Sequence, residues 1–434
     1  MVNVKVVIGA GFGDEGKGRM IDYFANRIPE KKLVVRFNGG AQAGHNVVLP
    51  NGLSHVHSHV GSGYLSNHDT FLSRHFICNP FLFRTEMQEL GALEALFAGM
   101  VYIDPKCRLT TPFDMTINQL LEDKRGSARH GSVGVGFGET IERITRRGDP
   151  LSNWHNYTRQ NILTALITIR DGWFRTRLAE IDAKETDCPW AFTTKMLVDF
   201  TDATLEMIEH RNVTISDIAS VAADGYQEIL FEGAQGLRLD MNYGQFPNVT
   251  RSNTGLKNVK GLLKEMEQEI YINGVETCYV TRSYATRHGN GPFIESLHPD
   301  YLRTEKETNV TNKYQGNFRY GHLDLGLLKH AIEYDLGHYP SCKVSIAATC
   351  LDQWVDKLEW KTTSGINIVG TQEQFVRDLT RLGTWHNLYL CDGPTRGSTS
   401  CRELSGVNSA VRVSGLHPGG RGFKSLTPHQ LQGA

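Results

Sequence analysis

A short glycine-rich loop near the N-terminus is the strongest constraint on what this chain can fold into. Residues 4–8 have the mostly apolar, β-branched pattern of a buried strand, and residues 9–18 (Gly-Ala-Gly-Phe-Gly-Asp-Glu-Gly-Lys-Gly) follow directly. Residues 19–24 then have the pattern of a helix. The spacing from Gly11 to Lys17 matches a phosphate-binding loop up to its lysine. Backbone N–H groups in such a loop, and the positive end of the following helix, attract an anion, so the sequence predicts a nucleotide phosphate site here.

Two features of this loop depart from an ordinary phosphate loop. Gly18 stands where Ser or Thr would hold magnesium, and the acidic pair Asp14-Glu15 lies inside the loop, where it would repel phosphate. A carboxylate at this place favours metal coordination or proton transfer beside the phosphate. The alternative is a glycine-rich turn between strand and helix whose acidic tip is solvated.

The charge balance argues against several classes of partner. The 434 residues include 46 basic and 47 acidic side chains, a formal net charge of -1, which gives no bulk attraction for nucleic acid or a membrane surface. No stretch approaches the roughly 20 apolar residues of a membrane span, and the N-terminus lacks the pattern of a signal peptide. The eight cysteines are scattered without a Cys-x-x-Cys pair. We therefore expect neither a zinc site nor a disulfide framework, but a cytoplasmic protein with reduced thiols.

The order of apolar runs predicts an α/β fold. Buried-strand patterns occur at residues 4–8, 33–37, 228–231, 276–281, 343–349 and 387–390. Strands that alternate with helices favour a mainly parallel sheet, because parallel strands need crossover connections. We expect a single domain over residues 1–434, with a large, mostly parallel central sheet flanked by helices and a mainly helical subdomain at about residues 85–225.

A second glycine loop, residues 38–46, also follows a predicted strand. In an open parallel sheet, loops at the carboxyl ends of strands line the ligand crevice, so this loop should face the first one. It contains His45, which could act as an acid–base group or as a donor to developing charge. A lone histidine is more often structural or solvated, and the loop context is what favours a functional interpretation of His45.

Further segments offer groups that suit anions. A third glycine-rich stretch precedes Arg146, which suits phosphate, although paired arginines are often a solvated helix face. Gln235 and Thr250 lie in polar clusters that would contact phosphate or a base edge, or else cap turns. Arg287 and Arg319 are candidates for binding a carboxylate-bearing substrate.

Taken in order along the chain, these elements resemble the adenylosuccinate synthetase family. The matching motifs lie at residues 13–18, 44–45, 231–236, 249–250, 252–254 and 291–293. No single motif except the first would suffice. Their shared order makes the resemblance specific, and it runs through most of the chain.

The resemblance implies a two-step ligation. A nucleoside triphosphate phosphorylates O6 of a 6-oxopurine nucleotide, IMP, and the amine of L-aspartate then displaces this phosphate to give adenylosuccinate. By position, Asp14 would take the N1 proton of the purine and, with the Gly44 carbonyl, ligate Mg²⁺. Lys17 would stabilise the migrating phosphoryl group, and His45 would donate to O6 or to the phosphate. The remaining nucleotide-binding residues implied by the resemblance are Gly13, Glu15, Gly16, Gly18, Gln42, Ser132, Val133, Arg146, Gln235, Thr250, Asp352 and Gly393.

The resemblance also implies partners. The family arginine that matches Arg146 reaches into a neighbouring subunit, so a homodimer is expected. Arg287 and Arg319 would bind the aspartate, and a C-terminal region at about residues 340–434 would recognise the base. The remaining partners are small-molecule substrates, with no nucleic acid and no membrane.

Three departures from the family bear on substrate choice. The guanine-reading Thr-Lys-x-Asp stretch appears here as Thr349-Cys350-Leu351-Asp352, so ATP and dATP join GTP as candidate phosphate donors. A single arginine, Arg319, remains of an arginine-rich aspartate loop, so that site is rebuilt or the amino acid differs. Gln42 and Val133 stand where Asn and Thr are usual, so the mononucleotide pocket is reshaped.

Such divergence is typical of a viral or otherwise specialised branch, for which the compartment would be the host cytoplasm. Phage relatives act on dGMP and give a succinylated 2-aminoadenine precursor, which is the alternative reaction for this chain. That branch often replaces the aspartate matching Asp14, which is kept here and favours IMP. Two other classes stay open: a non-catalytic nucleotide-binding regulator, at odds with the intact Asp14, Lys17 and His45, and a small-molecule kinase, which would not need aspartate.

Overall fold

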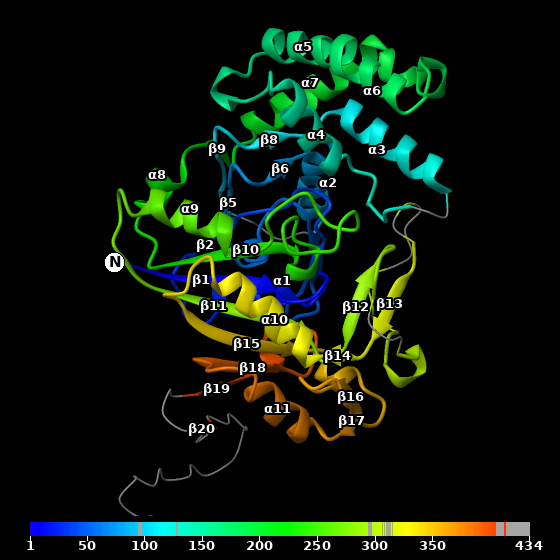
Figure 1. Cartoon of the computed structure of the whole chain (residues 1–434). Helices are drawn as coiled ribbons and strands as arrows, with labels where there is room; N and C mark the ends of the chain where they lie inside the picture. The colour runs from blue at the N-terminus through cyan, green and yellow to red at the C-terminus, as the bar shows by residue number, and fades with distance from the viewer. Residues whose placement is uncertain are drawn as a thin grey trace, which may run out of the picture.

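An eleven-stranded sheet forms the centre of the molecule (Figure 1), with strand order β20-β19-β18-β15-β11-β1-β10-β2-β5-β7-β9. The structure is a computed structural model and describes residues 1–93, 98–126, 129–293, 297–305, 307, 309, 314, 316–404 and 412–413. The strands are β1 (Val2–Gly9), β2 (Leu33–Arg36), β5 (Asp69–Leu72), β7 (Val101–Ile103), β9 (Val213–Ile215), β10 (Glu228–Gly236), β11 (Ile272–Arg282), β15 (Lys343–Thr349), β18 (Asn387–Cys391), β19 (Thr399–Glu403) and β20 (Arg412–Val413).

The pairing of these strands confirms the predicted fold class. Neighbours from β18 to β9 pair in parallel, and the two pairs that involve β19 are antiparallel. The six strand patterns expected from the sequence fall in β1, β2, β10, β11, β15 and β18. Much of the predicted C-terminal region beyond residue 404 lies outside the described residues.

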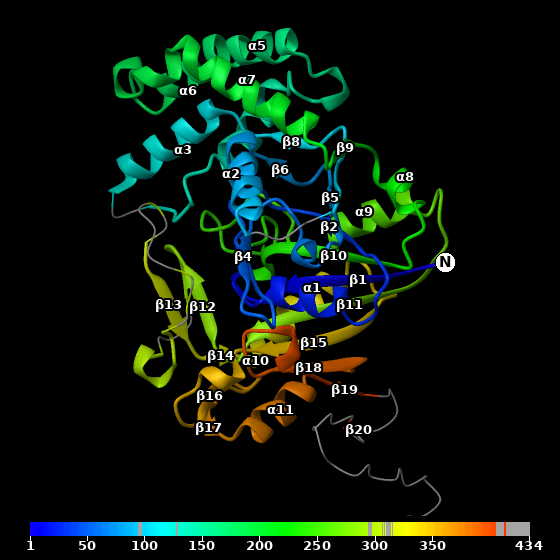
Figure 2. The ribbon, with the colours of Figure 1, turned by 180° about the vertical axis from the view of Figure 1, so that it is seen from behind.

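Helices cover both faces of the sheet, because its central strands are apolar on both sides. In β1, Val4, Val6 and Ile8 face one hydrophobic cluster, whereas Val7 faces another, as the two-residue period of a strand requires. The cluster around Val7 includes α1 (Lys17–Ala25), which lies on the face of the sheet toward the viewer in Figure 2. The opposite face carries α8 (Ile218–Ala222), α9 (Leu256–Met266), α10 (Leu325–Leu336) and α11 (Gln372–Thr380).

A helical layer lies beyond the β7–β9 end of the sheet, at the top of Figure 1. It has its own hydrophobic cluster, distinct from the two that sandwich the central strands. Its helices are α2 (Pro80–Gly91), α3 (Pro112–Arg125), α4 (Phe137–Arg147), α5 (Arg159–Thr168), the π-helical turn Ile169–Phe174, α6 (Arg175–Glu180) and α7 (Thr194–Glu209).

Short strand pairs lie outside the central sheet. The pairs are β3 (His45–Val48) with β4 (Ser54–His57), β6 (Ile77–Cys78) with β8 (Arg108–Leu109), and β12 (Ala285–His288) with β13 (Phe318–Gly321). A three-stranded sheet joins β14 (Leu323–Asp324), β16 (Leu358–Lys361) and β17 (Asn367–Gly370). The first and third of these pairs carry candidate functional residues.

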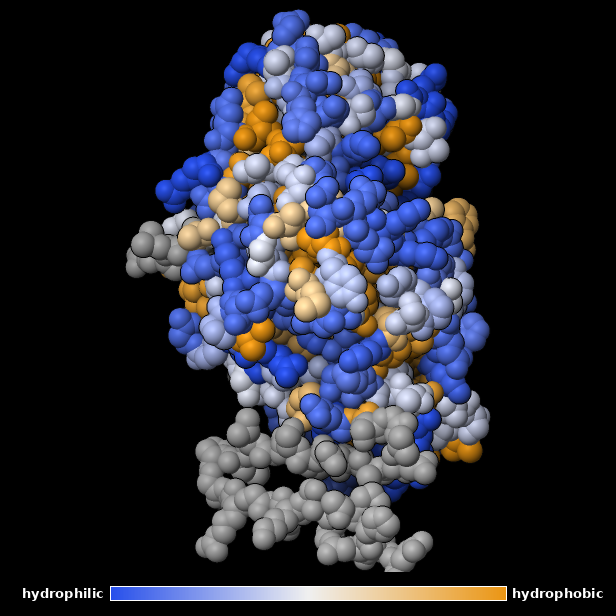
Figure 3. Space-filling view, turned by 90° about the vertical axis from the view of Figure 1, so that its left-hand side faces the viewer, coloured by the Kyte–Doolittle hydropathy of each residue, from blue (hydrophilic) through white to orange (hydrophobic). Residues whose placement is uncertain are grey.

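Polar side chains dominate the face of the molecule in Figure 3, where apolar residues appear in small groups. Across the described residues, no helix combines the length and apolar character that crossing a membrane demands.

A buried ion pair joins α3 to α4. The Arg143 guanidinium donates to the Asp114 carboxylate at 3.0 Å, and the two side chains are 1% and 0% exposed. Asp114 also completes a capping box with Thr111 at the start of α3. Because both charges are out of water, the pair stays stable only while each has its partner.

The Asp114→Ala substitution should therefore destabilise the protein strongly. It leaves the Arg143 charge buried with its main partner gone and removes the helix cap, so we expect the free energy of unfolding to fall by about 3–5 kcal/mol. Urea denaturation followed by circular dichroism measures this. Lys195→Ala breaks an ion pair with Asp199 whose lysine is 81% exposed, and should cost less than about 1 kcal/mol. A loss of that small size for Asp114→Ala would contradict the prediction.

Candidate functional site

A cleft with a volume of about 180 Å³ opens where the carboxyl ends of β10, β1 and β11 meet the start of α1. Parallel strands place their carboxyl ends at one edge of the sheet, so segments far apart in sequence converge there. Of the residues named from the sequence, the cleft lining contains Asp14, Gly16, Lys17, Gly18, Gly44, His45 and Gln235. The first two glycine loops therefore face each other across this cleft.

Glycine recurs in the first loop for two different reasons. Gly13 and Gly16 have left-handed φ values of 100° and 88°, a region that favours glycine. At Gly18 the reason is space, because a Cβ there would lie 2.9 Å from the Cβ of His45 and 2.8 Å from the Oγ of Ser62. The glycine at the usual magnesium-hydroxyl position thus lets the first turn of α1 pack directly against His45.

The Glu15 side chain turns back into the loop. Its carboxylate accepts hydrogen bonds from the backbone N–H groups of Gly11 at 3.0 Å and Gly13 at 2.7 Å, and from the Lys17 ammonium at 2.9 Å. Glu15 is 4% exposed, so the alternative of a solvated acidic tip is wrong for this residue. The inward-facing donors of the loop already hold an anion, which is the protein's own carboxylate.

We expect Glu15→Ala to change stability and ligand response together. The variant leaves the Lys17 ammonium buried without its carboxylate, so the free energy of unfolding should fall by about 3–5 kcal/mol. A bound nucleoside triphosphate would give Lys17 a new anionic partner. ATP or GTP should therefore raise the melting temperature of the variant more than that of the wild-type protein, as measured by scanning fluorimetry. The exposed Glu373→Ala variant is the control, and equal shifts in all three proteins would contradict this prediction.

Asp14 remains at the mouth of the loop, with its side chain half-buried. Its backbone has a φ of 61°, and its carbonyl oxygen accepts a 2.6 Å hydrogen bond from Nε of Arg282. Burial raises the pKa of the Asp14 carboxyl above its ordinary value, although nearby His288, Arg282 and Lys17 oppose this. A carboxyl with a raised pKa is suited to accept a proton. Asp14 and Gly44 also bring oxygen donors to the same cleft, the ligand type that Mg²⁺ prefers, so the residues present fit this ion.

His45 is held by a buried carboxylate on β10. Its Nδ1 lies 2.5 Å from Oε1 of Glu232, which is fully buried. Ser62 donates to the same carboxylate through its hydroxyl and, at 3.0 Å, through its backbone N–H. Burial lowers the pKa of His45 to about 4, although Glu232 opposes the shift, so the ring is neutral near pH 7. A neutral ring that donates from Nδ1 keeps Nε2 free for a ligand.

Glu232 is the functional residue that sequence reasoning missed. Burial favours its protonated form, but Arg36, His45 and Ser62 outweigh burial and hold the pKa of Glu232 well below its usual range. The residue lies within a recognised motif, at residues 231–236, yet received no role. A carboxylate directly after the buried apolar run at residues 229–231 was the available signal, because such a charge needs a partner.

Arg287 and Arg319 lie directly opposite each other on β12 and β13. Each donates to two backbone carbonyls, at 2.6–3.1 Å, and neither forms an ion pair with a carboxylate of the described residues. Arg287 lies 4.5 Å from the ring centre of Phe12 and Arg319 5.0 Å from that of Phe293. Burial, together with Arg319, lowers the pKa of Arg287 to about 10. Positive charge without a carboxylate partner is what a site for a carboxylate-bearing ligand requires.

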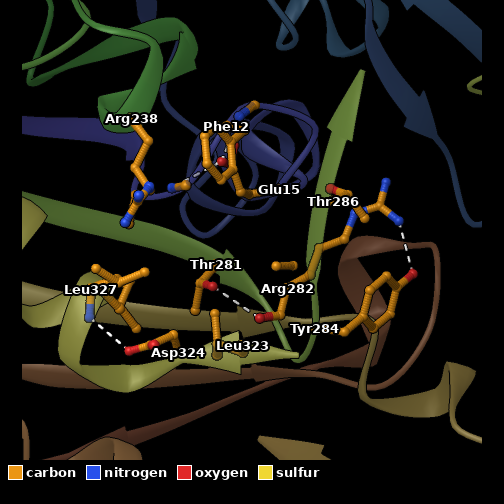
Figure 4. Close-up of a pocket in the computed structure, with 15 residues that line it drawn as sticks. Phe12, Glu15, Arg238, Thr281, Arg282, Tyr284, Thr286, Leu323, Asp324 and Leu327 are labelled. Carbon is orange, nitrogen blue, oxygen red and sulfur yellow. Dashed lines mark hydrogen bonds between the residues drawn. The ribbon is translucent and has the colours of Figure 1, made fainter. Parts of the chain in front are cut away.

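A second, smaller cavity of about 30 Å³ borders the first loop, and Figure 4 shows its lining. Arg238 lies 5.0 Å from the ring centre of Phe12 on this side, so Phe12 contacts two guanidinium groups. Glu15 and Gly13 line this cavity instead of the main cleft. The loop therefore borders two hollows, and Arg282 lines both of them.

Several residues predicted to bind the nucleotide are not among the residues that line the cleft. Ser132 and Val133 lie between α3 and α4, and Arg146 lies on α4, where it pairs with Glu180 at 2.9 Å. The backbone N–H of Thr250 donates to another backbone carbonyl. Their roles in nucleotide binding stay predictions.

The remaining predicted residues lie at or near the margin of the cleft. Asp352 is exposed, but its neighbour Gln353 lines the cleft. Gly393 precedes Pro394, which also lines it. The side-chain amide of Gln42 is buried and has no hydrogen-bond partner among the described residues. A buried amide without a partner is available to a ligand.

Comparison with known proteins points to one family. A family profile described as adenylosuccinate synthetase matches residues 6–353. An adenylosuccinate synthetase of Teredinibacter turnerae is 31% identical over 303 residues, 67% of this chain and 65% of that protein. One from Chromohalobacter salexigens is 29% identical over 341 residues, 76% of this chain and 73% of the relative. The match thus spans just under two thirds of the length of the first of these relatives.

Two solved structures share the fold over nearly the whole chain. The fully ligated adenylosuccinate synthetase of Plasmodium falciparum superposes with a TM-score of 0.69 at 20% identity, and covers 92% of this chain and 99% of its own. The succinoaminodeoxyadenylate synthetase of cyanophage S-2L, solved with dGMP and with dATP as energy donor, has a TM-score of 0.59 at 14% identity. It covers 92% of this chain and 95% of its own.

Proposed function

Because the chain belongs to the adenylosuccinate synthetase family, we propose that it is a ligase that forms a carbon–nitrogen bond on a purine nucleotide. A nucleoside triphosphate phosphorylates O6 of IMP, and the amine of L-aspartate displaces that phosphate to give adenylosuccinate. The observation that carries this proposal is the meeting of Asp14, Lys17 and His45 in one cleft, with His45 oriented by Glu232. A non-catalytic regulator would not need this arrangement.

The first step needs a base and a phosphate cradle side by side. Asp14, with its raised pKa, takes the N1 proton of the purine, so that O6 becomes the nucleophile. Lys17 and the loop N–H groups exchange their contact with Glu15 for the transferring phosphoryl group and stabilise its charge. Mg²⁺, held by Asp14 and Gly44, would neutralise charge on the phosphates.

His45 and Glu232 act on the same phosphoryl group. A phosphate near Nε2 favours the charged imidazolium, whose positive charge Glu232 stabilises through Nδ1. The ring then donates from Nε2 to O6 or to the phosphate, and the donated hydrogen bond makes the 6-phosphoryl group easier to displace.

The second step needs the amino acid close to C6. Arg287 and Arg319 are the proposed carboxylate ligands, and their lack of a carboxylate partner among the described residues supports this role. A diacid matches two adjacent guanidinium groups better than a neutral amino acid does. The amino acid is therefore proposed to be L-aspartate.

Finer assignments are part of the same proposal. Residues 340–434 recognise the base of the triphosphate, and GTP, ATP and dATP are all candidates because Cys350 stands beside the cleft. Residues 85–225 act as a helical subdomain from which Arg146 contacts a partner subunit in a homodimer. The protein works in a cytoplasm, that of the host if the chain is from a phage.

One further acceptor is dGMP. Cys350 stands where the resemblance implies a guanine-reading lysine, and Gln42 where it implies a phosphate-contacting asparagine, which supports an altered acceptor. The retained Asp14 favours IMP, so dGMP is the second candidate.

A substrate matrix tests the reaction. IMP, GMP, dIMP and dGMP are each combined with GTP, ATP or dATP, with Mg²⁺ and with or without L-aspartate. We expect aspartate-dependent release of phosphate and a product whose mass is that of adenylosuccinate with IMP. Phosphate release that does not depend on aspartate would point to a kinase. The ligase proposal would be refuted if no acceptor gave an aspartate-dependent product.

Substitutions test the roles of individual side chains. Asp14→Asn and His45→Ala should each lower kcat by about 10²–10⁴-fold, because each removes an acid–base group. Glu232→Gln should lower kcat by about 10–100-fold with little change in KM, because it loosens the orientation of His45. Steady-state kinetics measures all three, with the exposed Lys195→Ala as control. A Glu232→Gln variant with unchanged kcat would count against its positioning role.

A further inference from the structure

Three histidines and one glutamate gather behind the cleft, outside the machinery described so far. His55 and His57 are alternate residues of β4, so they lie on the same face of the β3–β4 hairpin. His57 is directly opposite His45 in this hairpin. Glu86 reaches the group from α2 and His59 from the segment that follows β4. All of these side chains are buried.

The ring nitrogens of this group are short of hydrogen-bond partners. Nε2 of His55 and both ring nitrogens of His57 are buried and have no partner in the described part of the chain. Nε2 of His55 lies 3.8 Å from Oε1 of Glu86, too far for a hydrogen bond. Buried polar nitrogens are normally satisfied, so three unsatisfied ones in a single cluster indicate a missing ligand.

Glu86, by contrast, is held firmly in one orientation. Its carboxylate accepts from the backbone N–H groups of Ser58 at 2.8 Å and His59 at 2.7 Å, and contacts Nδ1 of His59 at 3.1 Å. Nε2 of His59 accepts from the backbone N–H of Asn79, so Nδ1 must carry the proton that is donated to Glu86. This is the arrangement by which outer groups orient a metal-binding carboxylate.

We propose that His55, His57 and Glu86 bind one divalent transition-metal ion, zinc, which fastens β4 to α2. Their candidate ligand atoms all lie within 4.8 Å of one another, a spacing that small side-chain rotations close around a single ion. Two imidazoles and one carboxylate are a donor set that zinc takes in proteins, with the fourth position left to another ligand. His59 is a positioning residue, since both of its ring nitrogens are already engaged.

The charges around His57 favour a cation at this place. The carboxylates of Glu86 and Glu232, the ring of His55 and the guanidinium of Arg36 all act on His57. Two buried negative charges thus stand against one positive charge, and a dication reverses the imbalance. Both ring nitrogens of His57 lack a partner in the described part of the chain, so either one can offer its lone pair to a metal.

This site is separate from the magnesium expected at Asp14, and it does not depend on the proposed reaction. The scattered cysteines led us to expect no zinc site, but histidine and glutamate supply the ligands here. His57 on β4 lies opposite His45 on β3, so an ion bound at His57 would hold the strand that pairs with the one carrying His45. Its role is to hold that hairpin in place.

Metal analysis of the purified full-length protein tests the proposal. Protein from zinc-supplemented growth, dialysed against a weak chelator, should retain about one zinc per chain. After a strong chelator removes the metal, adding Zn²⁺ should raise the melting temperature, and adding Co²⁺ should give the strong visible absorption of a four-coordinate site. Failure of the wild-type protein to bind either ion would overturn the proposal, whatever the variants do.

Matched variants assign the site. His57→Asn and Glu86→Gln should abolish the cobalt band and the zinc-induced rise in melting temperature, and His59→Asn should weaken zinc binding by about 10–100-fold. Asp14→Asn, which alters the magnesium-type site, and His298→Asn, an exposed histidine, should leave both signals unchanged. Loss of the cobalt band in Asp14→Asn with retention in His57→Asn would place the ion elsewhere and refute the assignment.

Discussion

The arrangement of the cleft depends on the contacts made by one buried carboxylate, that of Glu232. It stands on a central strand, without exposure to water, and such a charge is stable only when its lone pairs are filled by donors. His45 and Ser62 fill them, and Arg36 balances the charge. Segments from β2, β3 and the loop after β4 therefore converge on one side chain of β10. The same contact that satisfies Glu232 selects the tautomer of His45.

The parallel sheet explains why such distant segments can meet. β1 lies between β10 and β11, and all three run in the same direction, so their carboxyl ends form a single edge. The loop after β1 supplies Asp14 and Lys17, β10 supplies Gln235, and β11 ends at Arg282, whose side chain holds the Asp14 carbonyl. The common direction of these strands, more than closeness in the sequence, determines which side chains share the cleft.

The sequence allowed the fold to be predicted because apolar strands and glycine loops leave regular patterns. It did not reveal where the side chains of Glu15 and Glu232 point. The Glu15 side chain points inward because the backbone of Asp14 is left-handed. The role of Glu232 depends on partner residues that come from three other segments. Gly18 was recognised as a departure from a magnesium site, but its reason, close packing against His45, is a tertiary contact. Likewise, order along the chain could not tell whether Arg146 reaches the cleft.

The inward Glu15 carboxylate has a consequence for which anions the loop can select. It is tethered a few bonds away from Lys17 and the N–H groups of Gly11 and Gly13, so its effective concentration is far above that of any free ion. A lone phosphate or sulfate offers the loop little more than Glu15 already does. A nucleotide brings additional contacts from its base and its other phosphates, and so can displace the tethered group. If the loop binds a nucleotide as proposed, it would favour ligands that bind at several points at once over small free anions.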